Sequence, residues 1–426
     1  MRSIPYPHLD ETLYTKQLDN GLRVYILPKA GFQKTYATFT TQYGSVDNHF
    51  AVGEDTPIQV PDGIAHFLEH KMFEEPEGDV FNKFASLGAS ANAFTSFDRT
   101  SYLFTATDNV LDNLGTLLDF VQSPYWTEES VEKEKGIIGQ EIKMYQDNPD
   151  WRSYFGLIEA MYKVHPIHID IAGTIESISK ITKDTLFNCY YTFYHPSNMV
   201  LFVVGGIDVN EVMEFVEQNQ AKKTFKPQGE IKHFFDPEPD QVHTPKKVIK
   251  LPVSLPKCLI GFKEVPLNQE GTPLLKRELT TKLLLDVLFS GSSPIYQSLY
   301  DENLISDSFG HEYNITADYS FSVFGGETRD PDLLISKIKD AVTAVQKQGI
   351  SEQSFERSRK KKIGSFLRMM NSPEAIAGEF TKYLFNGIDM FEILSVYENM
   401  KLEDVMKRFN EHFEWERLAI SIVRSD

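Results

Sequence analysis

The stretch Gly63-Ile-Ala-His-Phe-Leu-Glu-His-Lys-Met-Phe73 decides how this chain is interpreted. It contains His66, Glu69 and His70 in the pattern H-x-x-E-H. A helix turns by about 100° per residue, so positions i, i+3 and i+4 share one face. The stretch therefore predicts a helix whose two imidazoles bind one metal ion, with Glu69 beside the same spot.

A simpler interpretation competes with this prediction. The pattern has only three fixed positions, and two histidines on a helix are more often solvated or hydrogen-bonded than bound to metal. Phe67 and Leu68 fall on the other faces, so we expect a helix that is buried nearly all round. Buried polar groups need a partner. A zinc ion would be such a partner, provided that another part of the chain supplies a third ligand.

Length and composition limit the class of protein. The chain has 426 residues, which predicts two or three domains, and 41% hydrophobic with 24% charged residues is typical of a globular protein. A net charge of −18 argues against binding to nucleic acid. Two cysteines suit neither a disulfide framework nor a cysteine-rich zinc site. We find no signal-peptide core and no apolar run long enough for a membrane span, so we expect a cytoplasmic protein.

A second helix offers the third ligand. Thr127 is a good N-cap with two glutamates behind it, and the helix is predicted to run to about Gln146. Its apolar stripe carries Glu134 and Glu141, an unusual place for carboxylates. If the two helices pack together, Glu141 completes a His2Glu set, and Glu134 steadies the ligands from behind.

The order of predicted elements in the first half recurs in the second. In the first half we predict strands at 22–27, 35–43, 101–107 and 199–206, and helices at 66–72, 79–87 and 110–121. In the second half we predict strands at 248–251, 258–262, 319–324 and 418–423, and helices at 274–289, 331–348 and 351–368. The helix at 274–289 takes the place of the His66 helix and contains no histidine, so only the first half is expected to bind metal. The predicted domains are 1–218 and 248–426, joined by a linker at 219–247.

These features resemble the pitrilysin/insulinase family of zinc peptidases, in its half-size bacterial branch that is similar to the mitochondrial processing peptidases. The first match is the stretch around His66, which is the family's inverted zinc motif. The others are Gly88-Ala-Ser-Ala-Asn-Ala-Phe-Thr95 with Thr100-Ser-Tyr102, the pair Glu134 and Glu141 at close to the usual gap, and Gly173-Thr-Ile-Glu-Ser-Ile178 with Tyr194-His-Pro-Ser-Asn-Met199. Together they span residues 20–206, and the fainter repeat extends the resemblance over the whole chain.

The resemblance implies a fold, an activity and a set of roles. The fold is α+β, with two homologous domains that each contain a mainly antiparallel sheet covered by helices. The activity is zinc-dependent cleavage of short or unfolded peptides, in which the general base Glu69 takes the proton of a zinc-bound water. One zinc ion per chain would be held by His66, His70 and Glu141, with Glu134 as a supporting acid. Asn92 and Ala93 would lie on an edge strand that pairs with the substrate backbone, although Asn92 is equally compatible with a simple turn.

The second half departs from the family pattern. Members that act alone usually carry an Arg and a Tyr after a Ser-Ser-Arg-Leu stretch. Here Pro294 stands where the first Arg is usual, and Tyr300 stands where the substrate-side Arg is expected. The usual Tyr is replaced by Ser306 or Asp307. In some bacterial members a homologous subunit without zinc supplies both residues, so the resemblance implies the zinc subunit of a heterodimer, with a homodimer as the alternative.

A non-catalytic role is the competing interpretation of the whole chain. Some relatives are structural subunits, and a subunit that binds peptides without cleaving them is conceivable as well. Structural relatives usually lose a ligand or the base. This chain keeps all four of these residues, His66, Glu69, His70 and Glu141.

Overall fold

The computed structural model describes residues 1–76, 78–265 and 269–425. The chain divides into two compact units, and neither is a continuous segment. Unit 1 comprises residues 1–142, 169–235 and 370–382, and unit 2 comprises residues 143–168, 236–369 and 383–426. The units thus assign several segments differently from the predicted domains 1–218 and 248–426. The predicted linker at 219–247 also contains the end of one helix, a short strand and the start of another strand.

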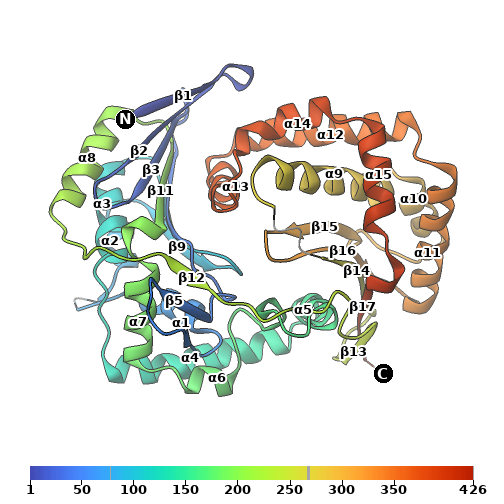
Figure 1. Ribbon diagram of the computed structural model, residues 1–426, viewed down its shortest axis with the longest axis horizontal. Helices are drawn as coiled ribbons and strands as arrows, with labels where there is room; N and C mark the ends of the chain where they lie inside the picture. Colours follow the sequence, from blue (N-terminus) through green and yellow to red (C-terminus); the bar gives the residue numbers. More distant parts are fainter. Residues whose placement is uncertain (77, 266–268, 426) are drawn as a thin grey trace. The chain divides into compact units, whose positions relative to one another are not determined.

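A mixed sheet forms the centre of unit 1. Its strands are β1 (Arg2–Tyr6), β2 (Glu11–Gln17), β3 (Arg23–Pro28), β4 (Thr35–Thr41), β9 (Ser90–Thr95), β10 (Thr100–Ala106) and β11 (Met199–Gly205). The order is β1-β2-β3-β11-β4-β10-β9 (Figure 1). The pairing of β11 with β3 is parallel, whereas the other pairings are antiparallel, as the resemblance implies. All residues of the apolar strand β11 are buried, because helices cover both faces of the sheet at this point.

The helices of unit 1 lie on both sides of that sheet. They are α1 (Ile64–Lys71), α2 (Phe81–Ser86), α3 (Val110–Val121), α4 (Glu128–Gln146), α6 (Ile175–Ser179), α7 (Lys183–Phe193) and α8 (Val209–Ala221), with α13 (Pro373–Phe385) from the second half. Figure 1 shows α3 and α8 on one side of the sheet and α13 on the other. Short 3₁₀ turns lie at Pro7–Leu9 and Pro196–Asn198.

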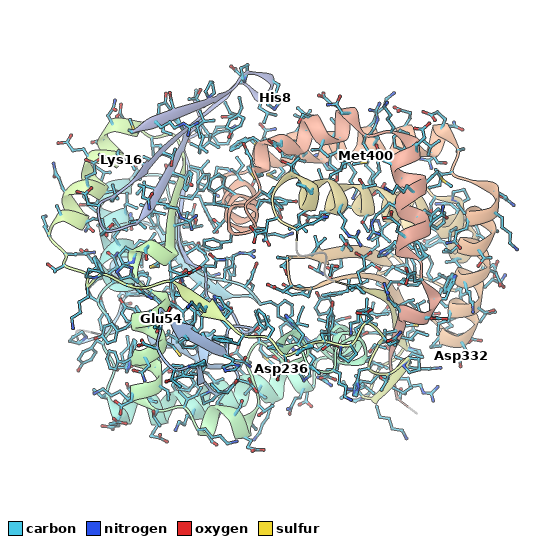
Figure 2. The ribbon with its side chains drawn as sticks, viewed as in Figure 1. His8, Lys16, Glu54, Asp236, Asp332 and Met400 are labelled. Carbon is cyan, nitrogen blue, oxygen red and sulfur yellow. The ribbon has the colours of Figure 1, made fainter. Side chains whose placement is uncertain are left out.

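Three small features of unit 1 were not predicted from the sequence. A second sheet contains β5 (His49–Val52), β6 (Ile58–Gln59) and β12 (Ile231–His233), and a two-stranded ribbon contains β7 (Glu74–Glu75) and β8 (Gly78–Asp79). The hairpin of β1 and β2 extends the main sheet, and Figure 2 places His8 at its tip.

Unit 2 is built around a sheet of the same kind. Its strands are β13 (Lys246–Lys250), β14 (Lys257–Glu264), β15 (Gly310–Ile315), β16 (Ser320–Glu327) and β17 (Leu418–Arg424). Its helices are α5 (Pro149–Met161), α9 (Thr272–Phe289), α10 (Pro294–Asp301), α11 (Pro331–Gln348), α12 (Glu352–Met369), α14 (Ile393–Asn399) and α15 (Leu402–His412). Short 3₁₀ turns lie at Pro166–His168, Met390–Glu392 and Trp415–Arg417. No helix in the described part of the chain is long and apolar enough to cross a membrane.

The two sheets confirm the predicted internal repeat. The order β13-β17-β14-β16-β15 in unit 2 matches β3-β11-β4-β10-β9 in unit 1, and in both the first pairing is parallel. By this correspondence α9 takes the place of α1, and α12 takes the place of α4. In unit 2 these two helices are joined by ion pairs from Asp286 to Lys361 at 2.8 Å and to Lys362 at 3.6 Å.

Each unit also receives one helix from the other half of the chain. Helix α5 follows α4 in sequence, yet it packs on β13, β14 and β17. Its Gly156 lies close to that sheet: a Cβ atom would be 2.6 Å from Ile249 Cδ1 and 2.7 Å from Ser421 Oγ, so these side chains would have to move. The corresponding helix α13 packs on unit 1, where Phe380 stacks on Phe202 at a centroid distance of 4.2 Å. The halves therefore exchange equivalent helices.

We expect Phe380→Ala to destabilise the protein strongly. Phe380 is 4% exposed and contacts both Phe202 and Tyr25, so the substitution leaves a cavity at the centre of unit 1. Such a change costs about 3–5 kcal/mol of unfolding free energy, measured by urea unfolding followed by circular dichroism. Leu367→Ala is the control, because Leu367 on α12 is 44% exposed and its loss should cost no more than about 0.5 kcal/mol. Equal stability of the two variants would contradict the exchanged packing.

Candidate metal centre

Helix α1 carries the three residues of the H-x-x-E-H motif and is buried nearly all round, as predicted. Phe67 and Leu68 are fully buried on its other faces. The residue before the helix is Gly63, which has φ +85° and lies so close to Ala172 that a Cβ atom would be 2.4 Å from the Ala172 carbonyl oxygen. The Asp62 side chain, just before this helix, does not cap it, because its carboxylate accepts a hydrogen bond from Asn48 Nδ2 at 2.8 Å.

Helix α4 supplies the carboxylates, and its start follows the prediction. Thr127 Oγ1 accepts a hydrogen bond from the Ser130 amide at 3.1 Å, which is the expected N-cap. The buried part of the apolar stripe of this helix consists of Val131, Ile138 and Ile142. The side chains of Glu134 and Glu141 are 15% and 21% exposed, so they are withdrawn from bulk water, unlike the exposed acids of the first turn.

The structure brings the three predicted ligands together. His66 Nε2 lies 3.7 Å from one carboxylate oxygen of Glu141, and His70 Nε2 lies 3.4 Å from the other. One ligand atom from each of the three residues lies within 4.8 Å of the others, and no second such group occurs among the described residues. These separations are long for hydrogen bonds. They are close to the roughly 3.3–3.5 Å that separates two ligand atoms bound at ~2.0–2.1 Å to one tetrahedral zinc ion.

Glu134 lies behind one of the ligands. Its Oε1 is 3.1 Å from His70 Nδ1, on the side of the ring that faces away from Glu141. When Nδ1 donates its proton to Glu134, Nε2 keeps its lone pair and is free to bind a metal. A carboxylate that orients a metal-binding histidine in this way is the role that the resemblance implies for Glu134.

The electrostatics of the site suit a divalent cation. Burial, followed by the neighbouring His70, lowers the pKa of His66 to about 4, so this imidazole is neutral at pH 7 and able to bind a metal. Burial also lowers the pKa of His70, but the hydrogen bond to Glu134 and the nearby carboxylates of Glu69 and Glu141 outweigh it, so the net pKa of His70 is raised. Two imidazoles and one carboxylate are a donor set typical of catalytic zinc, so the residues fit the ion.

The predicted substrate residues lie on the free edge of the main sheet. Strand β9 is the last strand of its sheet and pairs with β10. Asn92 is opposite Leu103 in this ladder, which excludes the turn interpretation. The Ser96 amide donates to the Arg99 carbonyl, so by the alternation of an antiparallel ladder the main chain of Ala93 points away from β10. Here the Ala93 amide donates to Asn92 Oδ1 at 2.9 Å.

One contact of the site was missed by sequence analysis. Thr95, the last residue of β9, donates a hydrogen bond from its hydroxyl to Glu69 Oε2 at 2.7 Å. Glu69 is 8% exposed, and its burial raises the pKa of its carboxyl, an effect that the Thr95 hydrogen bond partly offsets. Thr95 ends the second of the quoted motifs, which was the only signal that the sequence offered.

Comparison with known proteins finds relatives over nearly the whole chain. The family model described as insulinase (peptidase family M16) matches residues 59–175, and the model described as the peptidase M16 inactive domain matches residues 180–362. A Bacillus subtilis protein named as an uncharacterised zinc protease, YmfH, is 52% identical over 421 residues, which cover 99% of this chain and 98% of that protein. The chain belongs to the M16 peptidase family.

Other M16 relatives extend the agreement to the whole fold. A solved structure described as an M16-like peptidase, from Alicyclobacillus acidocaldarius, has a TM-score of 0.95 and 42% identity, and the match covers 99% of both chains. The Helicobacter pylori zinc protease PqqE is 25% identical over 409 residues, which cover 93% of this chain and 89% of that protein. Relatives in the M16 family are thus named zinc proteases, which supports a peptidase role and a zinc cofactor for this chain.

We expect Glu134→Gln to weaken zinc binding without unfolding the protein. The amide is a poorer acceptor for His70 Nδ1–H, so the ring becomes a less basic ligand. Loss of such a partner weakens metal affinity by about 10–100-fold, measurable by competition with a chromophoric chelator. Glu132→Gln is the matched control, because Glu132 lies on the exposed side of α4 and pairs with Lys135. If both variants bind zinc equally well, Glu134 does not support the site.

Proposed function

We propose that this chain is a zinc-dependent endopeptidase that cleaves short or unfolded peptides. The observation that carries the proposal is the convergence of His66 Nε2 and His70 Nε2 on the carboxylate of Glu141, with Glu69 on the same face of α1. The three residues are assigned as ligands of one zinc ion, and Glu69 is assigned as the general base.

The chemistry divides between the ion and the protein. Zinc, when bound, is a Lewis acid that lowers the pKa of water from about 15.7 to about 7 and polarises a peptide carbonyl. Glu69 takes a proton from the attacking water and delivers it to the leaving amine, so one carboxylate acts as base and then as acid. Glu134 keeps the ring of His70 in place during the reaction by accepting a hydrogen bond from its Nδ1.

The edge of the main sheet supplies the place for the peptide. The main chain of Ala93 points away from β10, so its carbonyl and amide are oriented to pair with an added extended strand. Asn92 is exposed, and its side-chain oxygen holds the Ala93 amide in this structure. An unfolded peptide can pair in this way because its backbone groups are free, which is why we assign short or unfolded substrates.

We expect Glu69→Gln to keep the metal and lose turnover. Glutamine has nearly the same shape as glutamate but accepts no proton at neutral pH, so kcat should fall by about 10²–10⁴-fold. Zinc content measured by plasma emission should remain near one ion per chain, and cleavage is followed with a fluorogenic peptide library. Glu132→Gln should match the wild type, and a zinc chelator should abolish activity in both. Normal peptide turnover by the glutamine variant would refute the assignment of the base.

We further propose that the chain works as the zinc subunit of a heterodimer. Helix α10, where the family's second-half Arg is expected, reads Pro294-Ile-Tyr-Gln-Ser-Leu-Tyr-Asp301 and contains no basic residue. Tyr300 is 45% exposed on this helix. A homologous chain without the zinc motif would supply the missing Arg and Tyr, and a homodimer would lack them in both copies.

Mixing experiments test the need for a partner. A homologous chain without the motif, purified from the same cells, should raise the peptidase activity of this chain by about 10²–10³-fold, the usual worth of one transition-state donor. The same mixture made with the Glu69→Gln variant should stay inactive, which assigns the activity to the zinc site of this chain. Full activity of the isolated chain would remove the need for a partner.

A further inference from the structure

Among the residues that the structure describes, Thr95 is the one whose side chain hydrogen-bonds to the carboxylate of Glu69. The bond is 2.7 Å long and ends on Oε2, and the described residues provide no hydrogen bond to Oε1. Because an ionised carboxylate only accepts hydrogen bonds, Thr95 is the donor. A glutamate side chain has three rotatable bonds, so without such an anchor its carboxylate samples several rotamers.

Thr95 itself is held firmly by its surroundings. It pairs with Thr100 across the β9–β10 ladder, and Thr100 is fully buried. The Thr100 hydroxyl donates to the Tyr43 carbonyl at 2.9 Å and lies 3.4 Å from Thr95 Oγ1. The anchor of Glu69 therefore lies within the β9–β10 ladder, opposite a buried residue of the neighbouring strand.

Thr95 also belongs to the strand that we assign to substrate binding. Successive side chains of a strand alternate between its faces, so the small side chains of Ala91 and Ala93 share the face on which Thr95 meets Glu69. By the alternation of the ladder, the main chain of Thr95 points to the same free edge as that of Ala93. One strand thus presents backbone groups at its edge and holds the base on its face.

We propose that Thr95 is a positioning residue for the general base. Its hydroxyl fixes Oε2 of Glu69, which leaves Oε1 as the oxygen that accepts the proton from water. The inference rests on the proposed peptidase reaction, because Thr95 acts through Glu69 and touches neither the metal ligands nor the substrate in this role. A misplacement of about 1 Å in such a group is enough to cost about 10²-fold in rate.

Thr95→Val tests the proposal, since valine keeps the shape and removes the hydroxyl. We expect kcat to fall by about 10–100-fold while KM and zinc affinity stay within about threefold of wild type. Thr95→Ser restores the hydroxyl and should recover kcat to within about threefold of wild type. A crystal structure of the valine variant should show Glu69 in more than one rotamer.

Thr105→Val is the matched control. Thr105 lies on β10 in the same hairpin, and its hydroxyl has no hydrogen-bond partner among the described residues. The same chemical change there should leave kcat, zinc affinity and the rotamer of Glu69 unchanged. This comparison separates a lost anchor from a general effect of valine on the hairpin.

The outcomes distinguish this inference from the proposed function. If the wild type cleaves peptides and Thr95→Val keeps its kcat, the positioning role is wrong and the peptidase assignment stands. A fall in kcat that serine does not rescue, or an equal loss of zinc affinity, would show a structural role and overturn the inference. A single, wild-type rotamer of Glu69 in the valine variant would overturn it even if the wild type cleaves nothing.

Discussion

The convergence of two imidazoles and a carboxylate at the meeting point of α1 and α4 is the interaction on which the site depends. Polar groups withdrawn from water are costly unless they are paired. His66 is buried and neutral, and its Nε2 faces a carboxylate at 3.7 Å, a separation that makes no good hydrogen bond. A cation between the three groups satisfies all of them at once. The apolar faces of α1 and the close approach of Gly63 to Ala172 fix the helix that presents two of these groups.

The internal repeat shows how unit 2 joins the corresponding pair of helices. Helices α9 and α12 correspond to α1 and α4, but Asp286 on α9 meets the ammonium groups of Lys361 and Lys362 on α12. A lysine cation thus links the two helices in unit 2, as we propose that zinc does in unit 1. An ammonium group has no coordination position for water or substrate. These ion pairs therefore link the two helices but supply no Lewis acid. The family description of an inactive domain for residues 180–362 agrees with that difference.

Local patterns predicted the parts of the site that depend on one helix at a time. The i, i+3, i+4 spacing placed His66, Glu69 and His70 on one face, and the Thr127 cap set the start of α4. Contacts set by tertiary structure were beyond prediction. The close approach of Gly63 to Ala172 at the start of α1 is one such contact, and no side-chain cap marks this start in the sequence. The apolar residues of α5 indicate a buried helix, but they do not say against which sheet it packs, so the exchange of α5 and α13 was missed. The partner of the Thr95 hydroxyl depends on how β9 lies against α1, which sequence spacing does not encode.

The environment of Glu69 shows how the fold balances opposing demands on a base. Burial at 8% exposure excludes water and raises the pKa of the carboxyl, which favours the neutral form. The proton acceptor must nevertheless be ionised before the reaction, and a base works best when its pKa lies near the working pH. The Thr95 hydroxyl stabilises the ionised form, and a cation held by the neighbouring ligands acts in the same direction. The hydrogen bond from Thr95 therefore stabilises the ionised form of Glu69 and also fixes the orientation of its carboxylate. Because it comes from the edge strand and not from α1 itself, the base is held by the same element that we assign to the peptide backbone.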